Sequence, residues 1–125
     1  MKKLLLTALL CFCVNAYAFN WKKVGESLIG DNYYVDVSNI KKHNGLIYYW
    51  ELVDYLDPNL GANSSIGKYK ANCGEEKLTW LNVTYYSQSM GRGTIIGEAF
   101  PNKSQYPKPK SVGYNLMKFA CDNAK

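Results

Sequence analysis

Only two cysteines, Cys73 and Cys121, are expected to remain in the working protein, and they constrain its fold more than any other feature. The first 18 residues have the layout of a secretory signal peptide: two lysines, an apolar run over residues 4–14, and the small residues Ala16 and Ala18 beside the cleavage point. Cleavage after Ala18 discards the other two cysteines and predicts an exported protein. An uncleaved anchor or a lipoprotein is the alternative, although the apolar run is too short for a membrane span.

In an oxidising compartment, two cysteines most simply form one disulfide, here between Cys73 and Cys121. This bridge would close a loop of about 48 residues and contribute roughly 4 kcal/mol in the chain-entropy model. Two free thiols or a metal pair are the alternatives. The chain has a single histidine and no third cysteine near the pair, so a metal site is disfavoured.

Size and charge predict one domain that does not bind nucleic acid. Residues 19–125 form a segment of 107 residues, which is enough for one domain. Without Lys2 and Lys3 the chain has 13 basic and 10 acidic residues, a net charge of +3. A charge this modest, scattered along an exported chain, favours solubility over nucleic-acid binding. No transmembrane segment is expected after signal cleavage.

Short runs rich in Tyr, Trp, Val and Ile, separated by turn-forming residues, predict an α+β fold. We expect an antiparallel sheet of about six strands, at residues 21–25, 33–37, 46–56, 68–73, 77–87 and 94–100. Residues 38–42 are expected to form a short connection or one helical turn, and residues 57–67 the longest polar loop. A break in alternation predicts a bulge near Leu81, or a strand covered on both faces.

A C-terminal helix is expected to cover this sheet. Ser111 is a suitable N-cap, because its hydroxyl can accept a hydrogen bond from a free backbone N–H. The apolar side chains that follow it have helical spacing and predict the buried face: Val112, Leu116, Phe119 and Ala120. The disulfide would fasten this helix to the end of the fourth strand.

Alternation in the strand at residues 46–56 predicts two faces of different exposure. We assign one set to the core: Leu46, Tyr48, Trp50 and Leu52. We assign the other set to a more exposed face: Ile47, Tyr49, Glu51, Val53 and Tyr55.

No set of residues predicts catalysis, a cofactor or a metal. His43 falls in a polar turn with Asn44 and Gly45, where a histidine is usually solvated. Asp36 and Asp54 could approach each other across neighbouring strands, but an Asp near a turn more often accepts bonds from backbone N–H groups. The sequence therefore favours a protein that is not an enzyme.

An aromatic surface is the strongest signal of binding. Tyr49 and Tyr55 lie on the face expected to be exposed, and Tyr86 is expected to project beside them. Tyrosine offers a large contact area at low entropic cost, so such a face suits a protein partner or a second copy of the chain. Lys108 and Lys110, on a stiff proline-containing segment, suit an anionic partner, or form a charged linker.

The ordered signals resemble the surface-adhesin protein E family of bacterial exported proteins. The segments that carry the resemblance are Trp21 with Val24 and Gly25, residues 34–36, residues 50–55, Cys73, residues 86–87, residues 90–93, and Ser111 with Cys121. Residues 109–111 read Pro-Lys-Ser where members often have Pro-Gly-Ser, and some members are lipid-anchored.

This resemblance implies a six-stranded antiparallel sheet with a C-terminal helix, in an exported, non-enzymatic protein. Named members bind host matrix proteins at the cell surface. The leading expectation is a protein-interaction module of the bacterial envelope, located in the periplasm or at the cell surface, with a partner in the envelope or extracellular matrix. The alternative is a soluble periplasmic domain that binds a small molecule in a pocket between sheet and helix.

Overall fold

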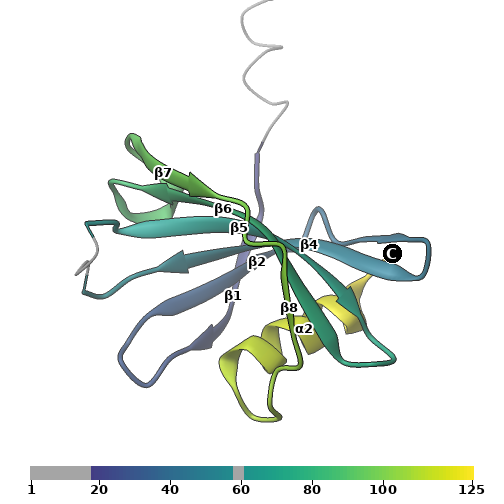
Figure 1. Ribbon diagram of the computed structural model, residues 1–125. Helices are drawn as coiled ribbons and strands as arrows, with labels where there is room; N and C mark the ends of the chain where they lie inside the picture. The colour runs from purple at the N-terminus through teal and green to yellow at the C-terminus, as the bar shows by residue number, and fades with distance from the viewer. Residues whose placement is uncertain (1–17, 58–60) are drawn as a thin grey trace, which may run out of the picture.

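The protein is described by a computed structural model, which covers residues 18–57 and 61–125. Residues 1–17 of the predicted signal peptide, which comprises residues 1–18, lie outside these ranges. Six strands follow each other across one antiparallel sheet in the order β1 (Trp21–Glu26), β2 (Asn32–Asp36), β4 (Leu46–Asp54), β5 (Ser64–Asn72), β6 (Lys77–Tyr86) and β7 (Ile95–Ala99) (Figure 1). The predicted α+β class is confirmed.

Two short strands extend the expected six. β3 (Lys41–His43) pairs with β4, and β8 (Lys103–Gln105) pairs with β6. The expected connection at residues 38–42 is therefore wrong, since its last two residues begin β3. Asn44 and Gly45 form the tight turn between β3 and β4 with positive φ angles of 51° and 79°.

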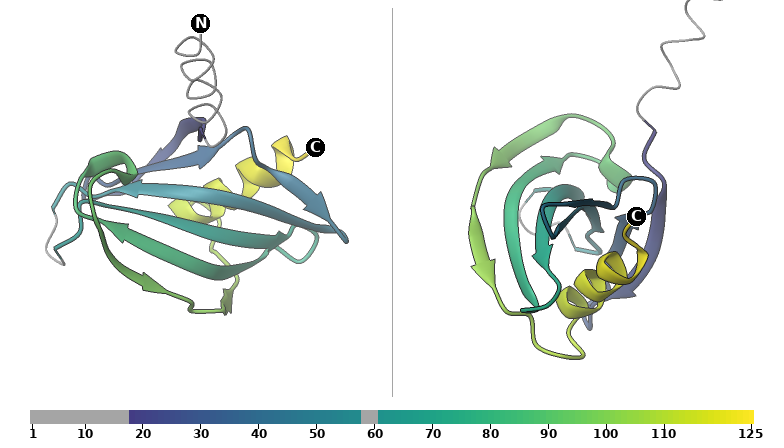
Figure 2. Two further views of the ribbon diagram at one scale, coloured as in Figure 1. Left: turned by 90° about the horizontal axis from the view of Figure 1, so that it is seen from above. Right: turned by 90° about the vertical axis from the view of Figure 1, so that its right-hand side faces the viewer.

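The sheet curls strongly around the helix α2 (Val112–Asn123). An end-on view shows α2 between the two edges of the curled sheet (Figure 2). The helix contacts β1, β2 and β4. We call the sheet face toward α2 the concave face and the opposite one the convex face.

The core lies between α2 and the concave face. Its buried side chains from the sheet are Val35, Ile47, Tyr49, Ala71 and Leu78, and those from the helix are Leu116, Met117 and Ala120. The predicted helix face is confirmed at Leu116 and Ala120, while Val112 and Phe119 are partly buried beside it.

The disulfide between Cys73 and Cys121 is present as predicted. The Cα atoms of the two cysteines are 6.1 Å apart. Cys73 follows the last residue of β5, and Cys121 lies in the final turn of α2. The bond thus joins the C-terminal part of the helix to one end of the central strand that β4 and β6 flank.

The assignment of faces in β4 was wrong. Ile47, Tyr49 and Glu51, expected to be the more exposed set, are buried on the concave face. Of the expected core set, Leu52 is buried, whereas Leu46, Tyr48 and Trp50 are partly exposed. The physical reason is that different elements cover the two faces at different points along the strand.

The short 3-10 helix η1 (Ser89–Gly91) covers the convex face at one end of β4. A Cβ on Gly91 would lie 2.7 Å from Ile66 Cδ1 and 3.7 Å from Leu52 Cδ1. Because Gly91 has a φ of 69° and this close approach, the glycine-rich turn fits tightly over the sheet. Leu52 is therefore buried from the convex side, while Tyr48 and Trp50 extend beyond this cover.

The polar loop expected over residues 57–67 is shorter than predicted. β5 begins at Ser64, and Ser64, Ser65 and Ile66 are all buried. Residues 58–60 lie outside the described ranges. The predicted bulge is confirmed: Lys68 pairs with Asn82 and Tyr69 with Trp80, so Leu81 is the extra residue.

The N-cap of α2 is a testable contribution to stability. The Ser111 hydroxyl accepts a hydrogen bond from the Tyr114 backbone N–H at 3.1 Å, as predicted. We expect Ser111→Ala to lower the free energy of unfolding by about 1 kcal/mol, measured by urea denaturation. Ser111→Asn keeps a capping acceptor and is the matched control. Equal stability of the two variants would show that the cap does not stabilise the helix.

Candidate functional site

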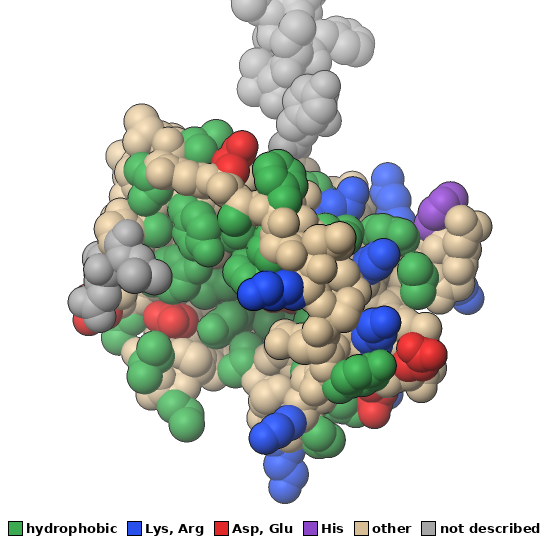
Figure 3. Space-filling view, in the orientation of Figure 1, with side chains coloured by type: hydrophobic (Ala, Val, Ile, Leu, Met, Phe, Trp, Pro, Cys, Tyr) green, Lys and Arg blue, Asp and Glu red, His purple; other side chains and the backbone are tan. Residues whose placement is uncertain are grey.

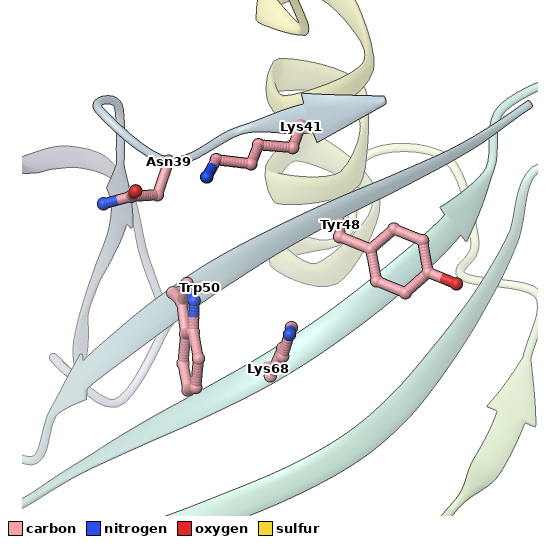
Figure 4. A pocket seen from close by; sticks show the side chains of 5 residues that line it. All are labelled: Asn39, Lys41, Tyr48, Trp50 and Lys68. Atoms are coloured by element: carbon pink, nitrogen blue, oxygen red, sulfur yellow. The ribbon is translucent and has the colours of Figure 1, made fainter. Parts of the chain in front are cut away.

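A groove on the convex face brings lysines and aromatic rings together. Its lining residues come from the turn before β3, from β3 itself, and from β4 and β5: Asn39, Lys41, Tyr48, Trp50 and Lys68 (Figure 4). We call this set the lysine–aromatic groove. It encloses a hollow of about 130 Å³. A wider, shallower hollow of about 510 Å³ continues from it past Lys42 and His43.

Strand register explains why these side chains meet. Lys41 in β3 pairs with Tyr48 in β4, and Trp50 in β4 pairs with Lys68 in β5. Residues that pair directly across antiparallel strands point to the same face. The groove is therefore built from neighbouring side chains on three consecutive strands, all on the side of the sheet away from α2.

Lys68 is held between the two aromatic rings. Its ammonium nitrogen lies 5.5 Å from the Trp50 ring centroid and 5.9 Å from the Tyr48 ring centroid. Each is a cation–π contact worth about 0.5–1 kcal/mol at an exposed site. Trp50 also meets the edge of the Phe19 ring at 6.2 Å. The ammonium group thus has a defined position in the groove.

Asp36 fixes the turn that carries Asn39 to the groove. This carboxylate is fully buried; its Oδ1 accepts hydrogen bonds from the backbone N–H groups of Asn20 and Ser38, and its Oδ2 accepts one from Asn39 Nδ2 at 2.6 Å. Asp54 similarly accepts a bond from the Met90 backbone N–H. Both carboxylates therefore accept hydrogen bonds from backbone N–H groups, the role that the sequence favoured over a catalytic pair.

The groove lacks an internal counter-charge. Among residues 18–57 and 61–125, no carboxylate lines either hollow. Within the same ranges, the one ion pair joins Lys23 to Glu26 on β1, so the groove lysines form none. The cluster of blue lysines near the purple histidine is visible in Figure 3. This surface is chemically suited to a negatively charged ligand.

The predicted aromatic surface does not form. Tyr49 has 0% exposure, and its hydroxyl donates to Glu51 Oε2 at 2.9 Å inside the protein. Its assignment to a partner surface was therefore wrong, because β4 turns this side chain toward α2. Tyr55 is partly buried and shares a hydrogen bond with Ser65 Oγ at 2.8 Å. Tyr86 pairs with Ser64, which contacts η1, and lies on the convex face.

The remaining predicted positions lie elsewhere. Lys108 and Lys110 are exposed in the segment between β8 and α2, outside the groove, and their role stays a prediction. His43 ends β3 and lines the wider hollow. The described residues contain no group of three or more His, Cys, Asp or Glu that could hold a metal ion. No helix within them is long and apolar enough to cross a membrane.

Sequence reasoning missed the groove because Tyr48 and Trp50 were assigned to the core. Its only local signal is the run Lys41, Lys42 and His43 immediately before the tight turn. The contribution of Lys68 depends on pairing across β4 and β5, which no local pattern reveals.

A buried carboxyl group lies on the concave face. Glu51 is 5% exposed, and burial raises its pKa from 4.5 to about 8, although the hydrogen bond from Tyr49 favours the ionised form. Burial also raises the pKa of Tyr49 well above its usual value. Glu51 is therefore largely protonated at neutral pH. Buried side chains fill the interface between sheet and helix, and both hollows at the lysine–aromatic groove lie outside that interface.

Similarity to known proteins agrees with this architecture. Structures of Haemophilus influenzae protein E superpose with TM-scores of 0.61 and 0.62 at 21% identity, covering 86% of this chain and 87% and 91% of theirs. A structure of protein E from non-typeable Haemophilus influenzae has a TM-score of 0.57 at 20% identity, covering 86% and 79%. At 20–21% sequence identity, this structural similarity shows that the chain shares the fold of these proteins. No curated protein matches the chain at a significant level.

Sequence similarity to a family covers most of the chain. The family model described as surface-adhesin protein E matches residues 21–122. This match runs from the first residue of β1 to the last turn of α2 and includes both disulfide cysteines. The chain belongs to the surface-adhesin protein E family.

Proposed function

We propose that this chain is an exported, non-enzymatic adhesin-like protein that binds a macromolecular partner through the lysine–aromatic groove. Residues 1–18 serve as its export signal and residues 19–125 form its single binding domain, acting in the periplasm or at the cell surface. The partner belongs to the envelope or the extracellular matrix. Membership of the surface-adhesin protein E family supports the binding role.

One observation carries the choice of surface. The groove combines two lysines that no carboxylate neutralises with two aromatic rings that remain partly exposed on a rigid sheet, within the described residues. Exposed aromatic and basic side chains with fixed positions contribute most to binding, because little conformational freedom is lost on association. Long-range attraction by the ammonium groups also accelerates encounters with an acidic partner.

Charge reversal in the groove tests the proposal. Lys41→Glu with Lys68→Glu is expected to reduce binding of residues 19–125 to decellularised epithelial matrix by about tenfold or more, because both attraction and local pairing are lost. Biolayer interferometry on the immobilised matrix measures the change. Lys118→Glu with Lys125→Glu makes the same change in net charge on exposed positions outside the groove and is the matched control.

A third double variant separates the groove from the other candidate lysines. Lys108→Glu with Lys110→Glu removes the two exposed cations before α2. We expect it to bind like the control pair. If it alone abolishes binding, or if the groove variant binds like the unmodified chain, the groove is not the binding surface.

A further inference from the structure

The groove continues into a wider pattern of cations and rings on the convex face. In one row across the sheet, Lys41 pairs with Tyr48, and Tyr48 pairs with Lys70. In the next row, Trp50 pairs with Lys68. Two lysines therefore flank the Tyr48 ring in the first row, and one lysine lies beside the Trp50 ring in the second. Rows of this kind are about 7 Å apart along a strand, so the charges form a regular array.

Polar side chains extend the same two rows. Lys70 pairs with Thr79, whose hydroxyl shares a 2.8 Å hydrogen bond with Ser104 of β8. Lys68 pairs with Asn82. Thr79 is only 7% exposed, so the hydroxyl at the surface is that of the exposed Ser104. Moving from β3 toward β8, the convex face thus presents ammonium groups, aromatic rings, an amide and the Ser104 hydroxyl. This sequence of groups offers partners for anions, for sugar ring faces and for sugar hydroxyls together.

Two other classes of occupant fit this surface less well. A peptide that adds a strand needs an open sheet edge of some length, but β4 and β5 are interior strands, and the edge strand at the groove, β3, is only three residues long. Insertion into a membrane surface needs a broad apolar face of aromatic and aliphatic side chains, whereas within residues 18–57 and 61–125 the large exposed apolar side chain that contacts the groove is the single Phe19, beside Trp50. The large exposed aliphatics of the described residues lie outside the groove: Leu28, Ile29, Leu56, Ile95 and Ile96.

We infer that the lysine–aromatic groove binds an acidic polysaccharide, with Lys41, Lys68 and Lys70 pairing with its sulfate or carboxylate groups. The Tyr48 and Trp50 rings pack against C–H faces of the sugar rings, which carry the partial positive charge that an aromatic face attracts. The 130 Å³ hollow between Lys41 and Lys68 receives one anionic group. The inference deepens the proposed function, since it names the chemical class of the partner.

Defined polymers test the partner class directly. Isothermal titration calorimetry would compare residues 19–125 with size-fractionated heparin oligosaccharide, with poly-glutamate of equal charge, and with phosphatidylserine vesicles. We expect heparin oligosaccharide to bind at least about fivefold more tightly than poly-glutamate, because only the sugar can use the rings as well as the charges. Its binding should weaken by roughly tenfold between about 50 mM and about 150 mM salt.

Two variants separate charge from ring contacts. Lys41→Glu with Lys68→Glu should weaken binding of both polymers, whereas Trp50→Leu should weaken heparin binding by about fivefold and leave poly-glutamate binding unchanged. Chemical-shift mapping of the unmodified chain with heparin oligosaccharide needs no variant and should place the perturbations on β3, β4 and β5. Equal affinity for both polymers, tighter vesicle binding, or perturbations elsewhere would overturn the inference.

Digesting the matrix distinguishes a failure of this inference from a failure of the proposed function. Treating the decellularised matrix with glycosaminoglycan lyases should remove most of the binding. Binding that survives digestion but is lost in the Lys41→Glu and Lys68→Glu variant would support the groove and reject a polysaccharide partner. Binding that survives both changes would reject both.

Discussion

Glu51→Gln should be more stable than the parent chain at pH 8, by up to about 5 kcal/mol. The carboxyl group of Glu51 is buried, and its pKa is raised from 4.5 to about 8. Between these two values the folded parent keeps a proton that the unfolded chain releases. Its free energy of unfolding therefore falls as pH rises from 4.5 toward 8, with no further fall above 8 from this group.

The variant should lack this pH dependence. Gln retains an oxygen that can accept the 2.9 Å hydrogen bond from the Tyr49 hydroxyl, and it does not ionise. Urea denaturation of both proteins at pH 4, 5, 6, 7 and 8 measures the difference, which should be near zero at the acid end and grow with pH. Glu98→Gln, at an exposed position of β7, is the matched control and should follow the parent.

Removing the Tyr49 hydroxyl supplies an independent check. Its hydrogen bond favours the ionised form of Glu51, so Tyr49→Phe should raise the Glu51 pKa further and extend the pH-dependent range upward. A parallel loss of stability with pH in the parent and in Glu51→Gln would show that this carboxyl group is not the one that titrates.

The elements of the fold could be predicted because local chemistry specifies them. Ser111 caps the helix where its sequence indicates, and Asn44 with Gly45 turns the chain between β3 and β4. The break of alternation at Leu81 corresponds to a real bulge. These signals depend on residues close together in sequence, so they do not depend on how distant parts of the chain fold.

The faces of the sheet could not be predicted because each depends on a distant element. Alternation separates Tyr48 from Tyr49 correctly but does not say which side α2 will cover. Leu52 belongs to the parity that faces away from α2, yet η1 buries it. A strand covered on opposite sides at its two ends has no single buried face.

The start of β5 was missed for a different reason. Ser64 and Ser65 look like loop residues, but their hydroxyls find partners: Ser64 Oγ donates to the Gln88 carbonyl oxygen, and Ser65 Oγ meets the Tyr55 hydroxyl. Buried hydroxyls are tolerated where such bonds form. The groove also could not be predicted from local sequence, since Lys41 and Lys68 come together only through strand pairing on the two sides of β4.

Loss of the disulfide should have the other large effect. Replacing Cys73 and Cys121 together by Ala is expected to lower the free energy of unfolding by about 4 kcal/mol, and Tm by roughly 15–30 °C for a domain of this size. The bridge spans a sequence separation of 48 residues, so it restricts the unfolded chain considerably. It also joins α2, which covers much of the concave face, to the end of β5.

The place where the structure opens distinguishes the local effect of removing the disulfide from a general loss of stability. Without the bridge, the C-terminal turn of α2 should open first, exposing Met117 and Ala120, and amide hydrogen exchange should rise there more than in β4. Differential scanning calorimetry gives the Tm change, and the parent treated with reducing agent should match the double variant. If both lose less than about 1 kcal/mol, packing of Leu116 and Met117 alone holds the helix, and the bridge would be dispensable for the fold.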